Sequence, residues 1–256
     1  MGSTVGAVVE LFALTRRFGE LTAVDNVSLS IAAAETFALI GPNGAGKSTL
    51  MKMLTTMLPP TSGSAQVAGF DVVAQPQQVR AHIGYVPQLL SADGDLTGYE
   101  NLQLSARLYL IPASERAAKI ESALALMGLS DAKHRLVRTY SGGMARRLEI
   151  AQSTLHRPAV LFMDEPTVGL DPGGRRAVWE HVAEMKHEIG AAVVFSTHYM
   201  DEAEEVSDRV GLINDGRLMA LGTPGELRAR LGPAASLDDV FTALTGAAIG
   251  ALGGMP

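Results

Sequence analysis

The chain has 256 residues, of which 47% are hydrophobic and 19% charged, and this composition excludes a wholly disordered protein. It contains no cysteine, which excludes disulfide scaffolds, cysteine-ligated zinc and iron–sulfur clusters. Its 21 Lys and Arg against 27 Asp and Glu give a net charge of -6, which argues against broad non-specific binding of nucleic acid. No apolar stretch reaches the roughly 18 residues of a membrane-spanning helix, so any action at a membrane is expected to need a separate partner.

The first elements along the chain are predicted to be strands. Residues 8–31 and 67–73 have β character and are expected to form a small antiparallel layer. Residues 36–40 form a short apolar run that predicts a buried strand, and a helix over 50–58 is expected to stop at Pro59-Pro60. Two further apolar runs, 160–163 and 191–195, predict buried strands separated by helices, which favours a parallel, doubly wound sheet.

The region between the first and second buried strands is predicted to be helical. Helices are expected over 97–111, 120–127 and 141–156, within a helical subdomain of about 89–159. Capping boxes at Thr223 and Ser236 predict two more helix starts, and Gly246 is expected to end the second helix. We therefore expect a main domain over 1–232 and a C-terminal tail over 233–256 with one short helix, poorly ordered from Gly246 on.

A phosphate-binding motif follows the first apolar run. Residues 41–48, GPNGAGKS, match the pattern G-x-x-x-x-G-K-[ST] between a predicted strand and a predicted helix. The glycines let backbone N–H groups approach phosphate oxygens, and the helix directs its positive end at the same anion. Lys47 is expected to reach the β- and γ-phosphates and the Ser48 hydroxyl to ligate Mg²⁺. The motif therefore predicts a nucleoside triphosphate site.

Polar residues also follow the other two buried runs. Asp164 and Glu165 come after residues 160–163, and His198 follows the third run. Ligands of open α/β sheets bind at the carboxyl ends of the strands, so one carboxylate is expected to serve the metal and the other to polarise an attacking water. Taken alone, the two carboxylates also fit an acidic helix start before Pro166, and His198 fits a structural role; the phosphate motif favours the catalytic interpretation.

A second glycine-containing helix start, Ser141-Gly142-Gly143-Met144, is a further candidate anion cradle. With it, the order of motifs resembles the ATP-binding cassette (ABC) family over about residues 8–232. The resemblance rests on the phosphate loop 41–49, YVPQ at 85–88, SGGM at 141–144, LFMDEPT at 161–167, GLD at 169–171 and STH at 196–198. It implies the fold class of a P-loop NTPase, a RecA-like parallel sheet core with a small antiparallel β layer and an inserted α-helical subdomain, in an ATPase domain over 1–232.

The resemblance also implies a role for each matching residue. Glu165 would be the general base and His198 its partner at the γ-phosphate, with Lys47 and Gln88 completing the catalytic set. Ser48, Gln88 and Asp164 would hold Mg²⁺. The residues implied to bind ATP are Phe18, stacking on adenine, Gly41, Pro42, Asn43, Gly44, Ala45, Gly46, Lys47, Ser48 and Thr49, together with Ser141, Gly142, Gly143 and Asp171.

In this family two copies would share ATP head to tail, with Ser141 and Gly143 contacting the γ-phosphate bound by the other copy and Asp171 linking the two sites. The implied partners are therefore a second copy or a homologous cassette and a separate transmembrane permease, which would hold the chain at the cytoplasmic face of the membrane. Residues 144–151, 196–204 and 237–241 are most similar to exporters of the multidrug or daunorubicin-resistance (ABC-2) type.

Two positions depart from the family pattern: Tyr140 stands where Leu is usual, and Met144 where Gln is common. Arg146 and Arg147 are interpreted as a solvated helix face, and the tail helix either packs on its own domain or contacts a subunit. The alternative function is a non-transport ABC ATPase acting on nucleic acid or in translation. Such proteins usually carry coiled-coil insertions or two cassettes, which are absent from these 256 residues. A small-molecule kinase would leave Ser141-Gly142-Gly143 without a role.

Overall fold

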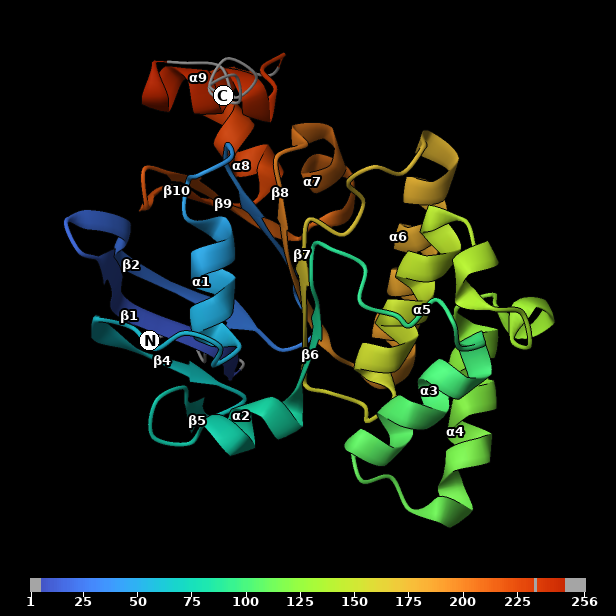
Figure 1. Cartoon of the computed structure of the whole chain (residues 1–256). Helices are drawn as coiled ribbons and strands as arrows, with labels where there is room; N and C mark the ends of the chain where they lie inside the picture. Colours follow the sequence, from blue (N-terminus) through green and yellow to red (C-terminus); the bar gives the residue numbers. More distant parts are fainter. Residues whose placement is uncertain (1–5, 233, 247–256) are drawn as a thin grey trace. The chain divides into compact units, whose positions relative to one another are not determined.

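The computed structural model describes residues 6–232 and 234–246, so most of the stretch predicted to be poorly ordered lies outside the described residues. Two compact units make up the chain (Figure 1). The first contains the residues up to Arg80 together with those from Ala192 onward, and the second runs from Ala81 to Ala191.

The first unit contains an antiparallel sheet with strand order β2-β1-β4-β5. Its strands are β1 (Ala7–Phe18), β2 (Leu21–Ala32), β4 (Ser62–Val67) and β5 (Phe70–Asp71). In β2, Val27, Leu29 and Ile31 are buried and alternate with exposed residues, as expected of a strand with one solvated face. The antiparallel layer predicted from 8–31 and 67–73 is present.

The first unit also contains a mostly parallel group of strands in the order β10-β9-β3-β8. Strand β3 (Thr36–Ile40) pairs in parallel with β8 (Ala192–Thr197) and β9 (Arg209–Asn214), and β10 (Arg217–Gly222) is antiparallel to β9. Every residue of β3 and β8 is buried, which explains why both read as continuous apolar runs.

Among the described residues of the first unit, four helices belong to it entirely: α1 (Lys47–Leu54), α7 (Met200–Val206), α8 (Pro224–Ala229) and α9 (Leu237–Thr245). Helix α1 begins and ends earlier than the predicted 50–58, because the phosphate motif itself opens the helix. The capping boxes at Thr223 and Ser236 are both formed, and Gly246 ends α9 in a left-handed conformation. Leu237, Val240 and Phe241 are buried, and the Leu237 amide donates to Glu204 Oε1 (2.8 Å), so the apolar face of α9 packs on its own unit.

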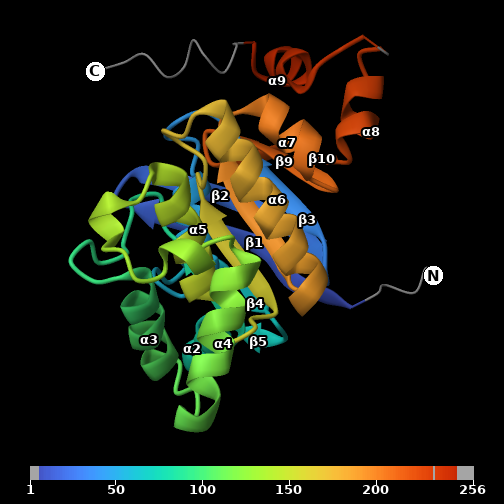
Figure 2. The ribbon, with the colours of Figure 1, turned by 90° about the vertical axis from the view of Figure 1, so that its right-hand side faces the viewer.

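The second unit pairs two parallel strands, β6 (Ile83–Val86) and β7 (Val160–Asp164). Strand β6 follows α2 (Pro76–His82), and β7 follows α5 (Gly142–Thr154). Its helices are α3 (Gly98–Leu108), α4 (Ala113–Leu126), α5 (Gly142–Thr154) and α6 (Pro172–Ile189), with short 3-10 turns η1 (Ser130–Ala132) and η2 (Val137–Thr139). Helices α4, α5 and α6 lie side by side (Figure 2). Helices α3, α4 and α5 fall within 89–159, although the exact bounds of a helical subdomain stay a prediction.

Two helix starts in the second unit lie where the sequence predicts them, whereas α4 begins at Ala113, before the predicted 120–127. Thr97 caps α3 with a complete capping box, and the Ser141 Oγ accepts from the Met144 amide at the start of α5. Within the described residues, no helix is long and apolar enough to cross a membrane.

Candidate functional site

The phosphate loop lies between β3 and α1 in the first unit and depends on glycine. Gly44 and Gly46 have φ values of +82° and +103°, which L side chains rarely adopt. A Cβ at Gly46 would also overlap the backbone oxygen of Ala23. Ala45 accepts a hydrogen bond from the Gly216 amide (3.0 Å), which fastens the loop to the turn between β9 and β10.

Lys47 is buried at the start of α1, with only 4% of its surface exposed. Its Nζ donates to the backbone oxygens of Gly41 (2.7 Å) and Pro42 (3.0 Å), so the ammonium group folds back over its own loop. A buried cation, left-handed glycines and a helix N-terminus all favour an anion at the same place. These residues fit the phosphates of a nucleotide, and Ser48 and Thr49 follow in the first turn of α1, both half-buried.

Phe18 ends β1 with 44% of its surface exposed. The guanidinium carbon of Arg16 lies 4.6 Å from the centre of the Phe18 ring, a cation–π geometry. The ring is therefore held from one side and remains accessible, as a residue that stacks on a base must be.

His198 follows β8 in the first unit and lies beside Tyr199, with ring centres 4.2 Å apart. The turn that carries it is held by Glu202, a buried acid in α7. Thr197 Oγ1 donates to Glu202 Oε2 (2.6 Å) and accepts from the Tyr199 amide (3.0 Å). Sequence reasoning missed this contact; a threonine directly before the candidate histidine is the signal that could have found it.

In the second unit, Asp164 and Glu165 lie at the end of β7 and are 3% and 6% exposed. Glu165 has a φ of +48°, and holding a non-glycine residue in this region costs on the order of 1–3 kcal/mol. Such strained residues cluster at active sites. The Gln88 Nε2 donates to Glu165 Oε2 (3.4 Å), so two predicted catalytic residues that are far apart in the sequence are in contact.

The pKa of Tyr85 in β6 depends on its burial and on the nearby carboxylate of Asp164. Burial, together with the negative charge of Asp164, raises the pKa of Tyr85 to about 12. Tyr85 pairs with Phe162 in the parallel register of β6 and β7, which places it on the strand next to the two acids. The phenol therefore stays neutral at physiological pH.

The second candidate anion cradle opens α5. Ser141 and Gly142 are exposed, and Ser141 is the N-cap whose Oγ accepts from the Met144 amide (3.2 Å). Asp171 is exposed at the N-cap position of α6 and makes no side-chain cap.

Tyr140, which departs from the family pattern, packs against Gly98 at the start of α3. Its hydroxyl donates to the backbone oxygen of Ala132 (2.7 Å), and a Cβ at Gly98 would overlap that hydroxyl. The tyrosine therefore has a local packing partner in this chain.

The interpretation of Arg146 and Arg147 as a solvated face is wrong for Arg146. Arg146 is 3% exposed and forms a buried ion pair with Glu149. The sequence prediction also missed Glu149, because the groups that this pair binds lie 58 residues away in the chain.

The donors for Mg²⁺ are few. Among the described residues, no group of three or more His, Cys, Asp or Glu could hold a metal ion by itself. Mg²⁺ usually keeps several waters and binds one or two carboxylates together with substrate phosphates. The Ser48 hydroxyl in the first unit and the Asp164 carboxylate in the second unit are each oxygen donors of the kind that Mg²⁺ accepts.

Comparison with known proteins supports the same interpretation. The family model of the ABC transporter matches residues 24–168. The chain is 44% identical over 227 residues to the daunorubicin/doxorubicin resistance ATP-binding protein DrrA of Streptomyces peucetius, covering 88% of this chain and 68% of the relative. A solved ATP-binding subunit of an ABC transporter superposes with a TM-score of 0.82 at 30% identity, covering 93% of this chain and 99% of that one. The cbiO1 protein of Clostridium perfringens, part of the ABC transporter complex cbiONQ, gives a TM-score of 0.80 at 27% identity, covering 88% and 92%.

The chain belongs to the ABC transporter family. It is an ATP-binding subunit that hydrolyses ATP to power an exporter, and its fold is that of an ABC ATPase, as the resemblance implied. The comparisons favour transport over the alternative of a nucleic-acid or translation factor.

Proposed function

We propose that two copies of this chain, or one copy and a homologous cassette, hold ATP between them head to tail. The contrast between its two anion cradles carries this proposal. The phosphate loop has the buried ammonium of Lys47, whereas the start of α5 offers only an exposed hydroxyl cap and glycines at a helix N-terminus. A cradle of the second kind completes a site whose phosphate another chain presents.

We propose the following roles within one ATP site. The loop from Gly41 to Thr49 holds the phosphates, Lys47 neutralises their charge, and Phe18 stacks on adenine. Ser48, Gln88 and Asp164 would hold Mg²⁺, which when bound supplies positive charge to the phosphate oxygens.

Glu165 acts as the general base of the hydrolysis step. It takes a proton from the attacking water, whose oxygen bonds to the γ-phosphorus as the bond to the bridging oxygen breaks, releasing ADP and phosphate. Gln88 and His198 orient the water and the γ-phosphate. The copy opposite would add Ser141, Gly142 and Gly143, and Asp171 links the two sites.

We also propose that the chain acts at the cytoplasmic face of the membrane, where a separate permease carries a drug-like molecule across the bilayer. The resistance function in the name of its Streptomyces peucetius relative supports this cargo class. The cbiO1 protein is part of the ABC transporter complex cbiONQ, and this supports a separate permease partner.

Replacing Glu165 by Gln tests the catalytic proposal. The amide can keep the contact with Gln88 but cannot take a proton, so turnover should fall by about 10²–10⁴-fold while ATP binding is kept. In the presence of ATP, a dimer of this variant should then accumulate, and light scattering should detect it as a doubled mass. The matched control is Glu184→Gln, an exposed glutamate on α6, which should behave like the parent. Hydrolysis at the parent rate by Glu165→Gln would show that Glu165 is not the base.

Purification from detergent-solubilised membranes tests the partner. The chain should come with a membrane-spanning companion that mass spectrometry identifies. A chain that is isolated alone and binds nucleic acid at physiological salt would contradict the transport partner and support the alternative.

A further inference from the structure

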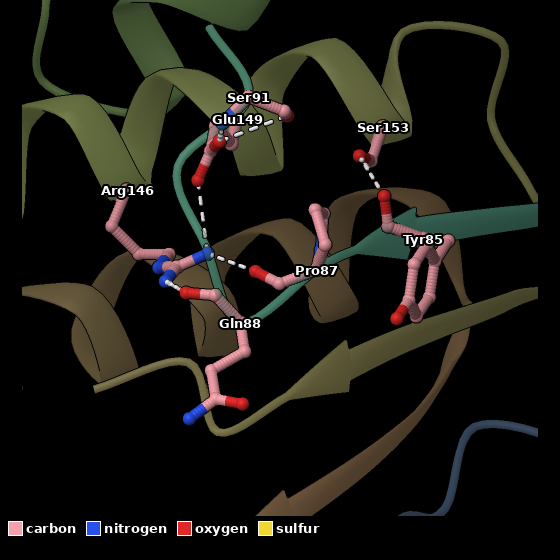
Figure 3. Close-up of polar contacts among 7 residues, drawn as sticks. All are labelled: Tyr85, Pro87, Gln88, Ser91, Arg146, Glu149 and Ser153. Atoms are coloured by element: carbon pink, nitrogen blue, oxygen red, sulfur yellow. Dashed lines mark hydrogen bonds and ion pairs between the residues drawn. The ribbon is translucent and has the colours of Figure 1, made fainter. Parts of the chain in front are cut away.

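A buried ion pair in α5 holds both ends of the segment that contains Gln88 (Figure 3). We infer that Arg146 and Glu149 are positioning residues for ATP hydrolysis: they fix residues 87–91, here called the Gln88 segment, and thereby aim Gln88 at Glu165. This inference rests on the roles proposed above for Gln88 and Glu165.

Arg146 binds the first end of the Gln88 segment. Its Nη1 donates to the backbone oxygen of Pro87 (2.6 Å) and to Glu149 Oε2 (2.9 Å), and its Nη2 donates to the backbone oxygen of Gln88 (2.7 Å). A guanidinium presents its donors in a rigid planar fork, so these bonds fix direction as well as distance. The carbonyl groups on both sides of the Gln88 Cα are therefore tied to α5.

Glu149 binds the other end. Its Oε1 accepts from both the amide and the hydroxyl of Ser91, the latter at 2.9 Å. Between the two anchors, Leu89 and Leu90 are 82% and 54% exposed, so their side chains do little to pack the segment in place. The position of the Gln88 segment therefore depends on polar contacts with this ion pair.

The two charged residues depend on each other. Arg146 and Glu149 are 3% and 2% exposed, and a buried charge without its partner is strongly destabilising. Burial lowers the pKa of Arg146, and the charge of Glu149 opposes that shift. The pair therefore acts as one unit, and either residue alone would be a poor anchor.

The neighbouring arginine shows that this contact is specific. Arg147 turns instead to the backbone oxygen of Met127 (2.8 Å) and to His181, and does not touch the Gln88 segment. Arg146 lies five residues after Ser141 on the same helix. Because a helix is stiff over this length, the position of its cradle at Ser141 and the position of Gln88 are mechanically linked.

A double-mutant cycle tests the inference. The double variant Arg146→Met/Glu149→Met removes the ion pair and its bonds to the Gln88 segment, here called the latch, without leaving one charge buried. Arg146→Lys keeps the positive charge but loses the planar set of guanidinium donors. At saturating ATP both should lower kcat, the double variant by about tenfold, the loss expected from about 1.4 kcal/mol. The KM for ATP should change less than about twofold, since the phosphate loop is untouched.

The decisive comparison uses Gln88→Ala as the background. If Arg146 and Glu149 act through Gln88, the double variant should lower kcat there by less than about twofold, a non-additive result. The matched control is Arg116→Met on α4, which removes a guanidinium bonded to a backbone oxygen, that of Ile111 at 2.7 Å, elsewhere in the unit. Arg116→Met should leave kcat as in the parent. Additive losses, a loss of thermal stability with unchanged kcat, or an equal effect of Arg116→Met would each overturn the inference.

A second readout does not depend on activity. The chain has no cysteine, so Leu89→Cys gives one attachment point for a fluorescent probe. The probe should rotate more freely in the double variant than in the parent, and as in the parent with Arg116→Met. Unchanged anisotropy in the double variant would overturn the inference that the ion pair fixes the Gln88 segment. A parent chain that does not hydrolyse ATP would overturn the proposed function instead, and the anisotropy would still test the inference.

Discussion

The phosphate loop before α1 and the Ser141 segment before α5 are both glycine-containing helix starts, but they are built differently. In the phosphate loop, Gly44 and Gly46 are left-handed and Lys47 is buried. Gly142 and Gly143 lie within the regular turn of α5, and no cation is among the first residues of that helix.

The difference shows how much of a phosphate site each segment makes alone. A curled loop with a buried ammonium supplies directed N–H groups and a full positive charge. A helix start with a serine cap supplies only partial charge and a hydroxyl. The first segment can bind a nucleotide on its own, whereas the second is suited to complete a bound one.

Removing the ammonium should give the largest effect on binding. Lys47→Ala should weaken ATP binding by about 10–100-fold, because hydrogen bonds to charged groups are worth about 1.5–3 kcal/mol. Isothermal titration calorimetry measures this. Lys52→Ala, an exposed lysine on the same helix, is the control that should bind like the parent. Unchanged affinity in Lys47→Ala would refute its phosphate role.

The glycines of the phosphate loop should be required for folding as well as binding. Gly46→Ala should lower the free energy of unfolding by about 1–3 kcal/mol, because its Cβ meets the Ala23 oxygen and its φ is strained. Gly44→Ala has the strain but open space around the new Cβ, so it should lose less. Urea denaturation measures both, and equal losses would show that the overlap contributes nothing.

A glycine of α5 should behave in the opposite way. A Cβ at Gly143 would lie 3.6 Å from Gly174 Cα, an ordinary contact, so Gly143→Ala should keep stability or raise it by up to about 1 kcal/mol. Turnover should nevertheless fall about tenfold, because a methyl group would keep the phosphate away from the backbone. Gly225→Ala in α8, where the new Cβ has open space, should likewise keep stability and should keep parent turnover. Parent turnover in Gly143→Ala would contradict the cradle.

The serine cap should give the smallest change. Ser141→Ala and Thr97→Ala each remove an N-cap in the same unit and should each lower the free energy of unfolding by about 1 kcal/mol. Only Ser141→Ala should also lower ATP turnover. Thermal melting and a phosphate-release assay compare the two, and equal turnover in both would reduce Ser141 to a structural cap.

Much of the fold was predictable because the signals are local. The continuous apolar run of β3, the glycines and Lys47 after it, and the caps at Thr97 and Ser141 all lie within a few residues of the structure that they specify. The approach of Gln88 to Glu165 depends instead on the parallel pairing of β6 with β7, in which Val86 faces Met163. Sequence reasoning reached Gln88 only through the resemblance to a family, whereas Glu165 was also predicted from its place after a buried apolar run.

The sequence by itself determined the phosphate loop, three buried strands, several helix starts, and the chemical types at each candidate position, since these follow from backbone preferences and the spacing of apolar residues. Only the tertiary structure decided that Arg146 is buried while Arg147 next to it is not, and that Glu202 holds the turn at Thr197. The physical reason is that a polar side chain is buried only where distant backbone oxygens or a partner charge can satisfy it, and chain folding alone brings those groups together.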